Sequence, residues 1–599
     1  MQRAVAALAA LLLLAAGAAA APAAPADACG VDCSSTFVPA LFGACLLGVN
    51  ANATVLPSID VAAWDQARRT FNYRTLRSPA AIFYAQSTEE VAAVVKCAHD
   101  WGVAVSPAAG RQGFQGLSVP DGALVVDVTA LTNTSLSQDG NTFTVGAGNS
   151  NVMTVSALHA TNTTGAAVPT GVCSFVGTAG FVLGGGFGLL GRYAGLACDS
   201  LVGLEMVLAN GTVVKANKTH HSDLLWASCG GGGGTLGIAT SFDFNVTRLP
   251  NDGRLTYLSI GYAGGVPSTV ASFKTFQDAL PALDRRFGFT YDISLGARLG
   301  LTGLFLGEPA EALQLLRAAG LLERLDSEPV ATPDTSDVAT NVSAGFLLKG
   351  FPSFYEMAAE QSVPFWTPPS ITPWGPFSNY TPSAANVAWT KKVMAGEPRV
   401  VGGPLYNVWH YSQSRLSAAL PDAGIQALAQ PRAGRRVGDP AADATAFPHR
   451  DKLFVLDAVV AVPSETADAA ASSFETVSTL AEPANVVNSF LSTIKPHLGA
   501  SEAAYANYQP NALANFEAAF WGGNAARLAA IKAAYDTLGT FNKPYTVSGA
   551  AAPAAAALAP DAPAPAPVPP PTGAATPGAR AGTLVATAVA ASVLALLLF

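Results

Sequence analysis

Charged residues are scarce in this sequence. Of its 599 residues, 33 are lysine or arginine and 41 are aspartate or glutamate, so 12% of the chain is charged against about 25% in a typical soluble protein. The net charge is −8, which leaves no basic excess to neutralise the phosphates of a nucleic acid. Hydrophobic residues make up 50% of the chain, and this excludes a wholly disordered protein.

Long apolar runs are absent from the interior of the sequence, which excludes a protein with many membrane-spanning helices. At the N-terminus, residues 1–20 combine Arg3 with an Ala/Leu run and small residues before Ala21. This pattern predicts a secretory signal peptide. The alternative is an N-terminal membrane anchor, which the weakly apolar run and the lack of a flanking basic cluster disfavour.

The C-terminal residues have the composition of a stalk followed by an attachment signal. Residues 549–583 are rich in alanine and proline, which favours an extended spacer, and they include small residues at 573–575. Residues 584–599 form an uncharged apolar tail. We expect this tail to be exchanged for a glycolipid (GPI) anchor, which would hold a secreted protein on the plasma membrane. The alternative is a retained single-span helix, which usually carries basic residues after the span.

The number of cysteines is odd, so a secreted chain that forms disulfides leaves at least one cysteine unpaired. The seven are Cys29, Cys33, Cys45, Cys97, Cys173, Cys198 and Cys229. Asn-X-Ser/Thr acceptors are numerous, which fits a glycosylated, secreted surface. They are Asn52, Asn133, Asn162, Asn210, Asn217, Asn245, Asn341 and Asn379.

Helix and strand signals alternate along the mature chain and predict an α+β protein. Ser87 and Glu90 form a capping box before a helix that ends at Gly102. Asn210-Gly211 is a tight-turn signal between two apolar strands. Residues 511–537 look helical. The other expected elements are strands at 80–85, 103–110, 122–129, 237–247, 254–264 and 452–462 and helices at 222–228 and 309–325.

Three stretches are unusually rich in glycine: 108–118, 169–195 and 229–237. Glycine lets the backbone approach a ligand closely, as loops that wrap a phosphate require. A dinucleotide-binding Gly-x-Gly-x-x-Gly loop must follow a strand and open a helix. Here residues 229–237 follow a helix and open a strand. The sequence therefore excludes a Rossmann fold at this loop, while the backbone chemistry still suits a pyrophosphate.

These residues resemble the berberine-bridge-enzyme-like FAD-linked oxidases, a branch of the family with a vanillyl-alcohol-oxidase-type (PCMH-type) FAD-binding domain. The resemblance rests on long motifs in the family's order. They are "GVC", "LGGGFG" and "GRYAGLACDS" within 171–200, "DLLWASCGGGGGTLGIATSFDF" at 223–244, "TAFPHRDKLFVLD" at 445–457, "AYANYQP" at 504–510 and "FWGGNAARLAAIKAAYD" at 520–536.

The resemblance implies a two-subdomain FAD-binding domain over residues 70–250. It also implies an α+β substrate domain with an antiparallel sheet over 251–500, and a segment at 501–547 that returns to the FAD domain. FAD is the implied cofactor. The implied cofactor-binding residues are Gly110, Arg111, Gln112, Gly113, Phe114, Leu117, Ser118, Gly171, Cys173, Val176, Gly177, Gly184, Gly185, Gly186, Gly188, Gly237, Ile238 and Asn507.

Gln112 is a departure from the family pattern. Many members carry a histidine at this position that bonds the flavin 8α carbon, and a glutamine cannot form that bond. Many members also carry a cysteine that bonds flavin C6, and Cys173 occupies that position. The resemblance therefore implies that any covalent attachment is through Cys173. The alternative is that Cys173 is an inert buried thiol or a disulfide partner.

For the remaining cysteines, the resemblance implies a disulfide between Cys45 and Cys97. Cys29 and Cys33 could pair with each other. We expect Cys198 and Cys229 to stay reduced. His220-His221 and Trp409-His410 lack the spacing of metal ligands, so they are expected to be surface or packing residues and no metal site is expected. His449 is expected to support a loop.

Catalysis requires a group that removes the hydroxyl proton while a hydride leaves for flavin N5. The resemblance places a tyrosine of the 505–508 segment there, so Tyr508 is the first candidate and Tyr505 the second. Asp457 could hold that tyrosine or act as the base, the alternative being a strand residue in a salt bridge. Asn507 would face the flavin.

The sequence thus predicts a secreted FAD-dependent oxidoreductase that acts on an alcohol or a sugar hemiacetal. Electrons would pass to dioxygen and give hydrogen peroxide, or to another acceptor. Two alternatives remain. One is a catalytically decayed flavin-fold binding or cell-wall protein, which Gln112 favours slightly. The other is a ring-closing oxidase of secondary metabolism, which shares the scaffold and differs in substrate.

Overall fold

The computed structural model describes residues 40–70, 77–113, 115–173, 176–262, 275–276, 278–280, 282–294, 298–322, 331–332, 346–361, 406–412, 440–450, 454–460, 503–507, 513 and 515–548. The predicted signal peptide, stalk and apolar tail lie outside these ranges, as do Cys29 and Cys33. In the described part of the chain, no helix has both the length and the apolar character needed to cross a membrane.

The first subdomain is a four-stranded sheet in the order β1-β2-β4-β3. Strands β2, β4 and β3 are parallel, and β1 runs antiparallel to β2. Every residue of β4 is buried, as expected for a central parallel strand. The strands are β1 (Thr54–Val55), β2 (Ala81–Tyr84), β3 (Val105–Ala108) and β4 (Leu124–Asp127), with helices α2 (Ala40–Asn50), α3 (Val61–Ala67) and α4 (Thr88–Asp100).

Helix α4 begins where the capping signal predicts. The Ser87 hydroxyl accepts a hydrogen bond from the Glu90 N–H at 3.2 Å. The reciprocal bond differs from the expected box, because the Glu90 carboxylate accepts from the N–H of Gln86 at 2.8 Å. A disulfide between Cys45 and Cys97 joins α2 to α4 and confirms that predicted pair.

The second subdomain is an antiparallel five-stranded sheet in the order β5-β6-β10-β8-β9. Strands β8 and β9 form the predicted hairpin, and Gly211 lies in its turn with φ +81°. The strands are β5 (Thr134–Leu136), β6 (Thr142–Gly146), β8 (Leu201–Val207), β9 (Val213–Asn217) and β10 (Ile238–Asn245), with a small ribbon of β7 (Ala166–Ala167) and β11 (Thr247–Arg248). The helices are α5 (Asn151–His159), α6 (Thr178–Leu183), α7 (Gly191–Ala194) and α8 (Ser222–Ala227), and 3₁₀ turns lie at Ala197–Ser200 and Asn251–Gly253.

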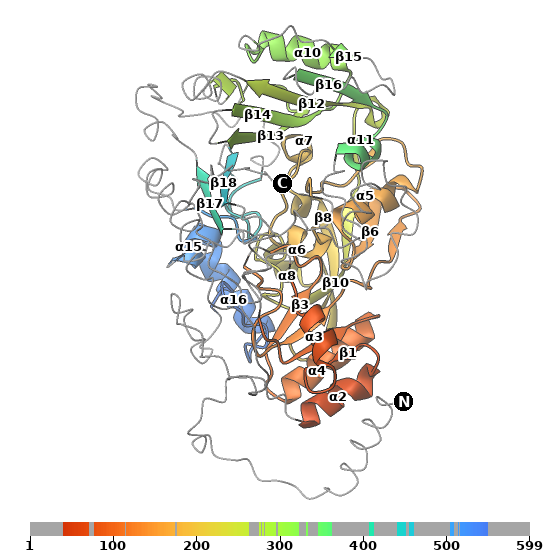
Figure 1. Ribbon diagram of the computed structural model, residues 1–599, viewed down its shortest axis with the longest axis vertical. Helices are drawn as coiled ribbons and strands as arrows, with labels where there is room; N and C mark the ends of the chain where they lie inside the picture. The colour runs from red at the N-terminus through yellow and green to blue at the C-terminus, as the bar shows by residue number, and fades with distance from the viewer. Residues whose placement is uncertain are drawn as a thin grey trace, which may run out of the picture.

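The third sheet lies at the opposite end of the molecule from α2 and α4 (Figure 1). Its order is β13-β14-β12-β16-β15, and all pairs except β15–β16 are antiparallel, which confirms the expected antiparallel sheet. Helix α10 packs on it through Ala312 and Leu316. The elements are β12 (Leu255–Tyr262), β13 (Phe287–Ser294), β14 (Arg298–Phe305), β15 (Ala331–Thr332), β16 (Phe346–Phe351), α10 (Pro309–Ala318) and α11 (Phe354–Gln361).

The end of the described chain returns to the first two subdomains, where α16 packs against α8 (Figure 1). Helix α15 (Phe516–Trp521) and α16 (Ala525–Tyr535) are separated by a 3₁₀ turn at Gly522–Asn524. The sequence predicts one helical region here, and Gly522 with φ +48° interrupts it. A two-stranded ribbon of β17 (Tyr406–Ser412) and β18 (Phe454–Val460) completes the described elements.

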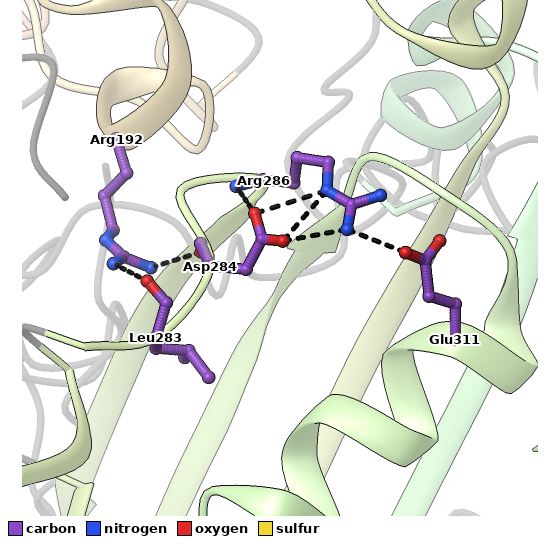
Figure 2. A network of polar contacts seen from close by, with 5 residues as sticks. All are labelled: Arg192, Leu283, Asp284, Arg286 and Glu311. Atoms are coloured by element: carbon purple, nitrogen blue, oxygen red, sulfur yellow. Dashed lines mark hydrogen bonds and ion pairs between the residues drawn. The ribbon is translucent and has the colours of Figure 1, made fainter.

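Arg192 joins the second glycine-rich stretch to the third-sheet region (Figure 2). It lies on α7, and its guanidinium donates hydrogen bonds of 2.7–3.1 Å to four backbone carbonyls. These belong to Leu280, Leu283, Asp284 and Phe287. The same turn is held from its other side, since Arg286 pairs with Asp284 at 2.8 Å and with Glu311 of α10 at 2.7 Å. Hydrogen bonds from Arg286 lower the pKa of the Asp284 carboxyl, against the raising effect of burial.

Candidate active site

The first two glycine-rich stretches meet at Gly110 and Gly177. A Cβ atom built on Gly177 would lie 2.5 Å from the backbone nitrogen of Gly110. No side chain fits that space, so the close approach of the two backbones requires glycine. The sequence identifies the two stretches separately, and the fold brings them together.

Arg111 anchors the first stretch to the end of β4. Its guanidinium forms an ion pair with Asp127 at the end of β4, with 2.5 Å between Nη2 and Oδ2, and donates to the carbonyl of Ala67. The Asp127 side chain is 1% exposed and that of Arg111 11%. The guanidinium therefore positions the loop. If Arg111 contacts the cofactor as predicted, it does so through its backbone, which has φ +52°.

Gln112 follows in the same loop and is half-buried. Its side-chain amide donates to the carbonyl of Gly110 at 3.2 Å. Gly113 is exposed, Leu117 is buried and Ser118 is half-buried. Phe114 lies outside the described residues. The amide of Gln112 thus supports the turn at the position where the resemblance implies a histidine in many family members.

Cys173 is buried and, among the described cysteines, is the one outside a disulfide. The backbone on both sides of it is held by Asn151, a residue that the sequence did not single out. The Asn151 amide donates to the Cys173 carbonyl at 3.0 Å, and its backbone N–H donates to the Val176 carbonyl at 2.9 Å. Gly171 lies against the same amide. Asn151 is 2% exposed and is the first residue of α5, directly after the N-cap Ser150. The serine N-cap is the sequence signal that could have identified Asn151.

Tyr505 and Asn507 pack against the loop after α6. The Tyr505 hydroxyl accepts hydrogen bonds from the N–H of Gly186 and from the Asn507 amide, both at 3.0 Å. Asn507 also donates to the carbonyl of Gly180 at 2.9 Å. Its amide fills the space where Gly184 would carry a side chain. Gly184, Gly185, Gly186 and Gly188 therefore form one loop that is held from the distant C-terminal segment.

Tyr505 is 1% exposed, and burial raises the pKa of its phenol well above the ordinary value. The donors from Gly186 and Asn507 act in the opposite direction and are weaker. The ring packs edge-on against Phe187 with 5.0 Å between centroids. This environment keeps the phenol protonated and favours a supporting role for Tyr505 over that of a base.

The other two catalytic candidates are Asp457 and Tyr508. Asp457 lies in the middle of β18, opposite Trp409 of β17. Tyr508 lies outside the described residues. The assignment of the proton acceptor therefore stays a prediction.

The expectation that Cys198 and Cys229 stay reduced is wrong. The two form a disulfide that ties the 3₁₀ turn before β8 to the start of the third glycine-rich stretch. Their sequence positions are 31 residues apart, and only the fold brings them within bonding distance. Asp199 lies beside them, but the sulfurs are bonded to each other, so this group offers no thiolate ligands to a metal.

The 445–450 segment packs against the same stretch. Arg450 forms an ion pair with Asp199 at 2.7 Å, and the Phe447 N–H donates to the Cys229 carbonyl at 2.9 Å. His449 is buried beside the carbonyl of Phe520 at 3.1 Å, the loop-supporting role expected for it. Ile238 begins β10 directly after Gly237, and the Ile238 side chain is in the core. Ile238 therefore supports the site through packing.

Comparison with known protein families identifies the cofactor domain. Residues 79–217 match the family described as "FAD binding domain", and residues 504–547 match the family described as "Berberine and berberine like". These two matches contain the first two glycine-rich stretches, Tyr505 and Asn507.

Individual relatives agree with these matches. The chain is 33% identical over 261 residues to the glucooligosaccharide oxidase of Sarocladium strictum, covering 43% of this chain and 51% of that protein. It is 25% identical over 506 residues to the chitooligosaccharide oxidase of Gibberella zeae, covering 81% and 90%. The chain spans 30–58% of the length of four curated relatives that it matches at 32–33% identity.

The fold is also that of solved structures. Glucooligosaccharide oxidase from Acremonium strictum, described with a 6-S-cysteinyl, 8α-N1-histidyl FAD, aligns with a TM-score of 0.66 at 23% identity, covering 85% of this chain and 100% of that one. The architecture of an FAD-binding domain followed by an antiparallel third sheet is therefore shown.

The residues present fit an FAD. Glycine backbones approach one another where a Cβ would fill the space, and Cys173 supplies a buried reduced thiol within them. The loop of Gly184 to Gly188 is held rigidly by Tyr505 and Asn507. These are the features that an extended, phosphate-bearing cofactor needs.

Proposed function

We propose that this chain, a member of the berberine-bridge-enzyme-like FAD-linked oxidoreductases, oxidises the hemiacetal carbon of a sugar or a related alcohol. The observation that carries the proposal is the contact of the first and third glycine-rich stretches with the second, which contains buried, reduced Cys173. The names of two relatives, glucooligosaccharide oxidase and chitooligosaccharide oxidase, support a carbohydrate substrate. Bound FAD would supply a hydride acceptor at N5.

The protein's own residues would position the reactants and move the proton. Tyr508 removes the hydroxyl proton as the hydride leaves, with Asp457 as the residue that orients it or replaces it. Tyr505 keeps its proton because burial raises its pKa. It holds the loop of Gly186 in place and so fixes one wall of the site.

Dioxygen is the proposed electron acceptor, giving hydrogen peroxide. The support is that the relatives named above are oxidases.

Cys173 is the proposed covalent attachment, through flavin C6. The solved relative is described with both a cysteinyl and a histidyl linkage. In this chain Gln112 stands at the histidine position and uses its amide to support the turn. A single cysteinyl bond is the expected result.

The proposed location is the cell surface. Two disulfides, Cys45–Cys97 and Cys198–Cys229, support an oxidising compartment because such bonds rarely persist in the cytosol. The N-terminal signal pattern and the C-terminal stalk and tail support secretion followed by lipid anchoring.

A specific observation also favours a second candidate, a binding protein on a decayed flavin scaffold. It is the loss of the histidine at Gln112. The two are separated by purifying the secreted protein and measuring its flavin absorption, then screening oligosaccharides and alcohols for peroxide release. A yellow protein that releases peroxide with a sugar supports the oxidase. A colourless protein that stays colourless after incubation with FAD overturns it.

A further inference from the structure

Lys543 lies where three segments meet: the end of the described chain, β3 and the third glycine-rich stretch. A Cβ built on Gly234 would lie 3.1 Å from the Lys543 Nζ and 2.7 Å from the ring of Pro107. Pro107 belongs to β3, which leads directly into the first glycine-rich stretch. The chain beyond α16 is fixed along this strand, because the Val105 N–H donates to the carbonyl of Thr540 at 2.8 Å.

The ammonium of Lys543 is not compensated by the groups around it. Within the described part of the chain it has no hydrogen-bond or ion-pair partner. The nearby carboxylate, Asp536, is already bound to Lys532 and accepts from the N–H groups of Thr540 and Phe541. Lys532 is itself held by the carbonyls of Thr235 and Phe541, at 2.6 and 2.9 Å.

The local charge is therefore positive. The Asp536 carboxylate pairs with Lys532, and burial together with the charge of Lys532 lowers the pKa of Lys543 to about 8. A half-buried cation without a partner is costly unless an anion completes the site. Phosphate oxygens suit such a lysine.

We propose that Lys543 binds the pyrophosphate of FAD, acting with the backbone of the glycine-rich stretches at 108–113 and 229–237. The inference rests on the proposed FAD-binding function and assigns a residue to one part of the cofactor. The sequence did not include Lys543 in the cofactor set, because it lies in none of the glycine-rich stretches. Its place beside Gly234 depends on the return of the C-terminal segment.

Affinity for parts of the cofactor tests this assignment. The full-length chain carrying Cys173→Ser is stripped of flavin, and binding of FAD, ADP and riboflavin is measured by fluorescence and calorimetry. Adding Lys543→Gln should weaken FAD and ADP about 10- to 100-fold, the effect of losing one charge-assisted hydrogen bond. Riboflavin, which has no phosphate, should bind as before. Lys543→Arg should restore most of the affinity for FAD and ADP.

Lys218→Gln is the matched control, because this lysine is exposed and distant in sequence; it should leave all three affinities unchanged. Equal FAD affinity with and without Lys543 overturns the inference while leaving the proposed function intact. A parallel loss of riboflavin binding also overturns it, since the contact would then be to the flavin ring or to the fold. A Cys173→Ser chain that binds no FAD at all, although wild-type protein carries it, places the affinity in the covalent bond and overturns the inference. If the wild type also lacks FAD, the proposed function fails with it.

Discussion

At the scale of single residues, Cys173 and Gln112 have opposite consequences for the flavin. Cys173 is a buried thiol whose neighbouring backbone is fixed by Asn151, whereas Gln112 cannot form a bond to the flavin. We predict that acid precipitation of the purified protein leaves flavin on the polypeptide and that Cys173→Ser releases it. Flavin that washes freely from the acid-precipitated wild type would refute the linkage. Gln112→His is a useful companion variant, since it could restore a second bond.

The two tyrosines of the 505–508 segment should behave differently when their hydroxyls are removed. Tyr508→Phe should keep flavin binding but slow flavin reduction by about 10²–10⁴-fold, the usual effect of losing a general base. Stopped-flow absorption measures this rate. Reduction at the wild-type rate would transfer the role to Asp457.

Tyr505→Phe removes an acceptor from the buried Gly186 N–H and from the half-buried Asn507 amide, which keeps its bond to the Gly180 carbonyl. Leaving the Gly186 N–H unsatisfied costs about 1–3 kcal/mol, so the variant should have a lower free energy of unfolding. Denaturant unfolding measures this loss. If the Tyr505 variant is as stable as wild type and slow in flavin reduction, the supporting role assigned to Tyr505 is wrong.

At the scale of elements, Arg192 connects α7 to the turn before β13 (Figure 2). Its four backbone acceptors make it a fixed bridge between the FAD-binding and third-sheet regions. We predict that Arg192→Met lowers the free energy of unfolding by at least about 3 kcal/mol, because each bond to a charged group contributes about 1.5–3 kcal/mol. Limited proteolysis should then cleave between the regions sooner than in wild type.

The matched control for Arg192 is Arg254→Met. Arg254 pairs with Glu308 at 2.9 Å, but both side chains are about half exposed, at 44% and 53%. An exposed pair of this kind contributes about 0–1 kcal/mol. Equal losses in the two variants would show that Arg192 does not bridge the regions.

At the scale of the whole molecule, the proposed anchor concerns residues beyond the described fold. The apolar tail at 584–599 is shorter than the roughly 20 residues that span a bilayer core of about 30 Å. We predict that a phosphatidylinositol-specific phospholipase releases active protein from intact cells and that the released chain lacks this tail. Peptides from 584–599 in the mature membrane-bound protein would show instead that the helix is retained.

The sequence by itself determined the type and position of those elements that carry strong local signals. Local signals suffice for these, as the Ser87 cap, the Asn210-Gly211 turn and the alternation in β10 show. The motifs around the glycine-rich stretches also carried the family resemblance that implies FAD, because the residues of each motif are close together in the chain.

Only the tertiary structure decided which distant groups share the site. Tyr505 and Gly186 are 319 positions apart, and Cys198 and Cys229 are 31 apart. The Tyr505 contact depends on how the C-terminal segment folds back onto the glycine loops, and the disulfide on how the third glycine-rich stretch packs against the turn before β8. No local pattern encodes either arrangement. The same reason applies to Arg111, whose guanidinium binds Asp127 because β4 ends beside the loop. Side-chain roles of this kind follow from packing, since a hydrogen bond requires atoms about 3 Å apart whatever their separation along the chain.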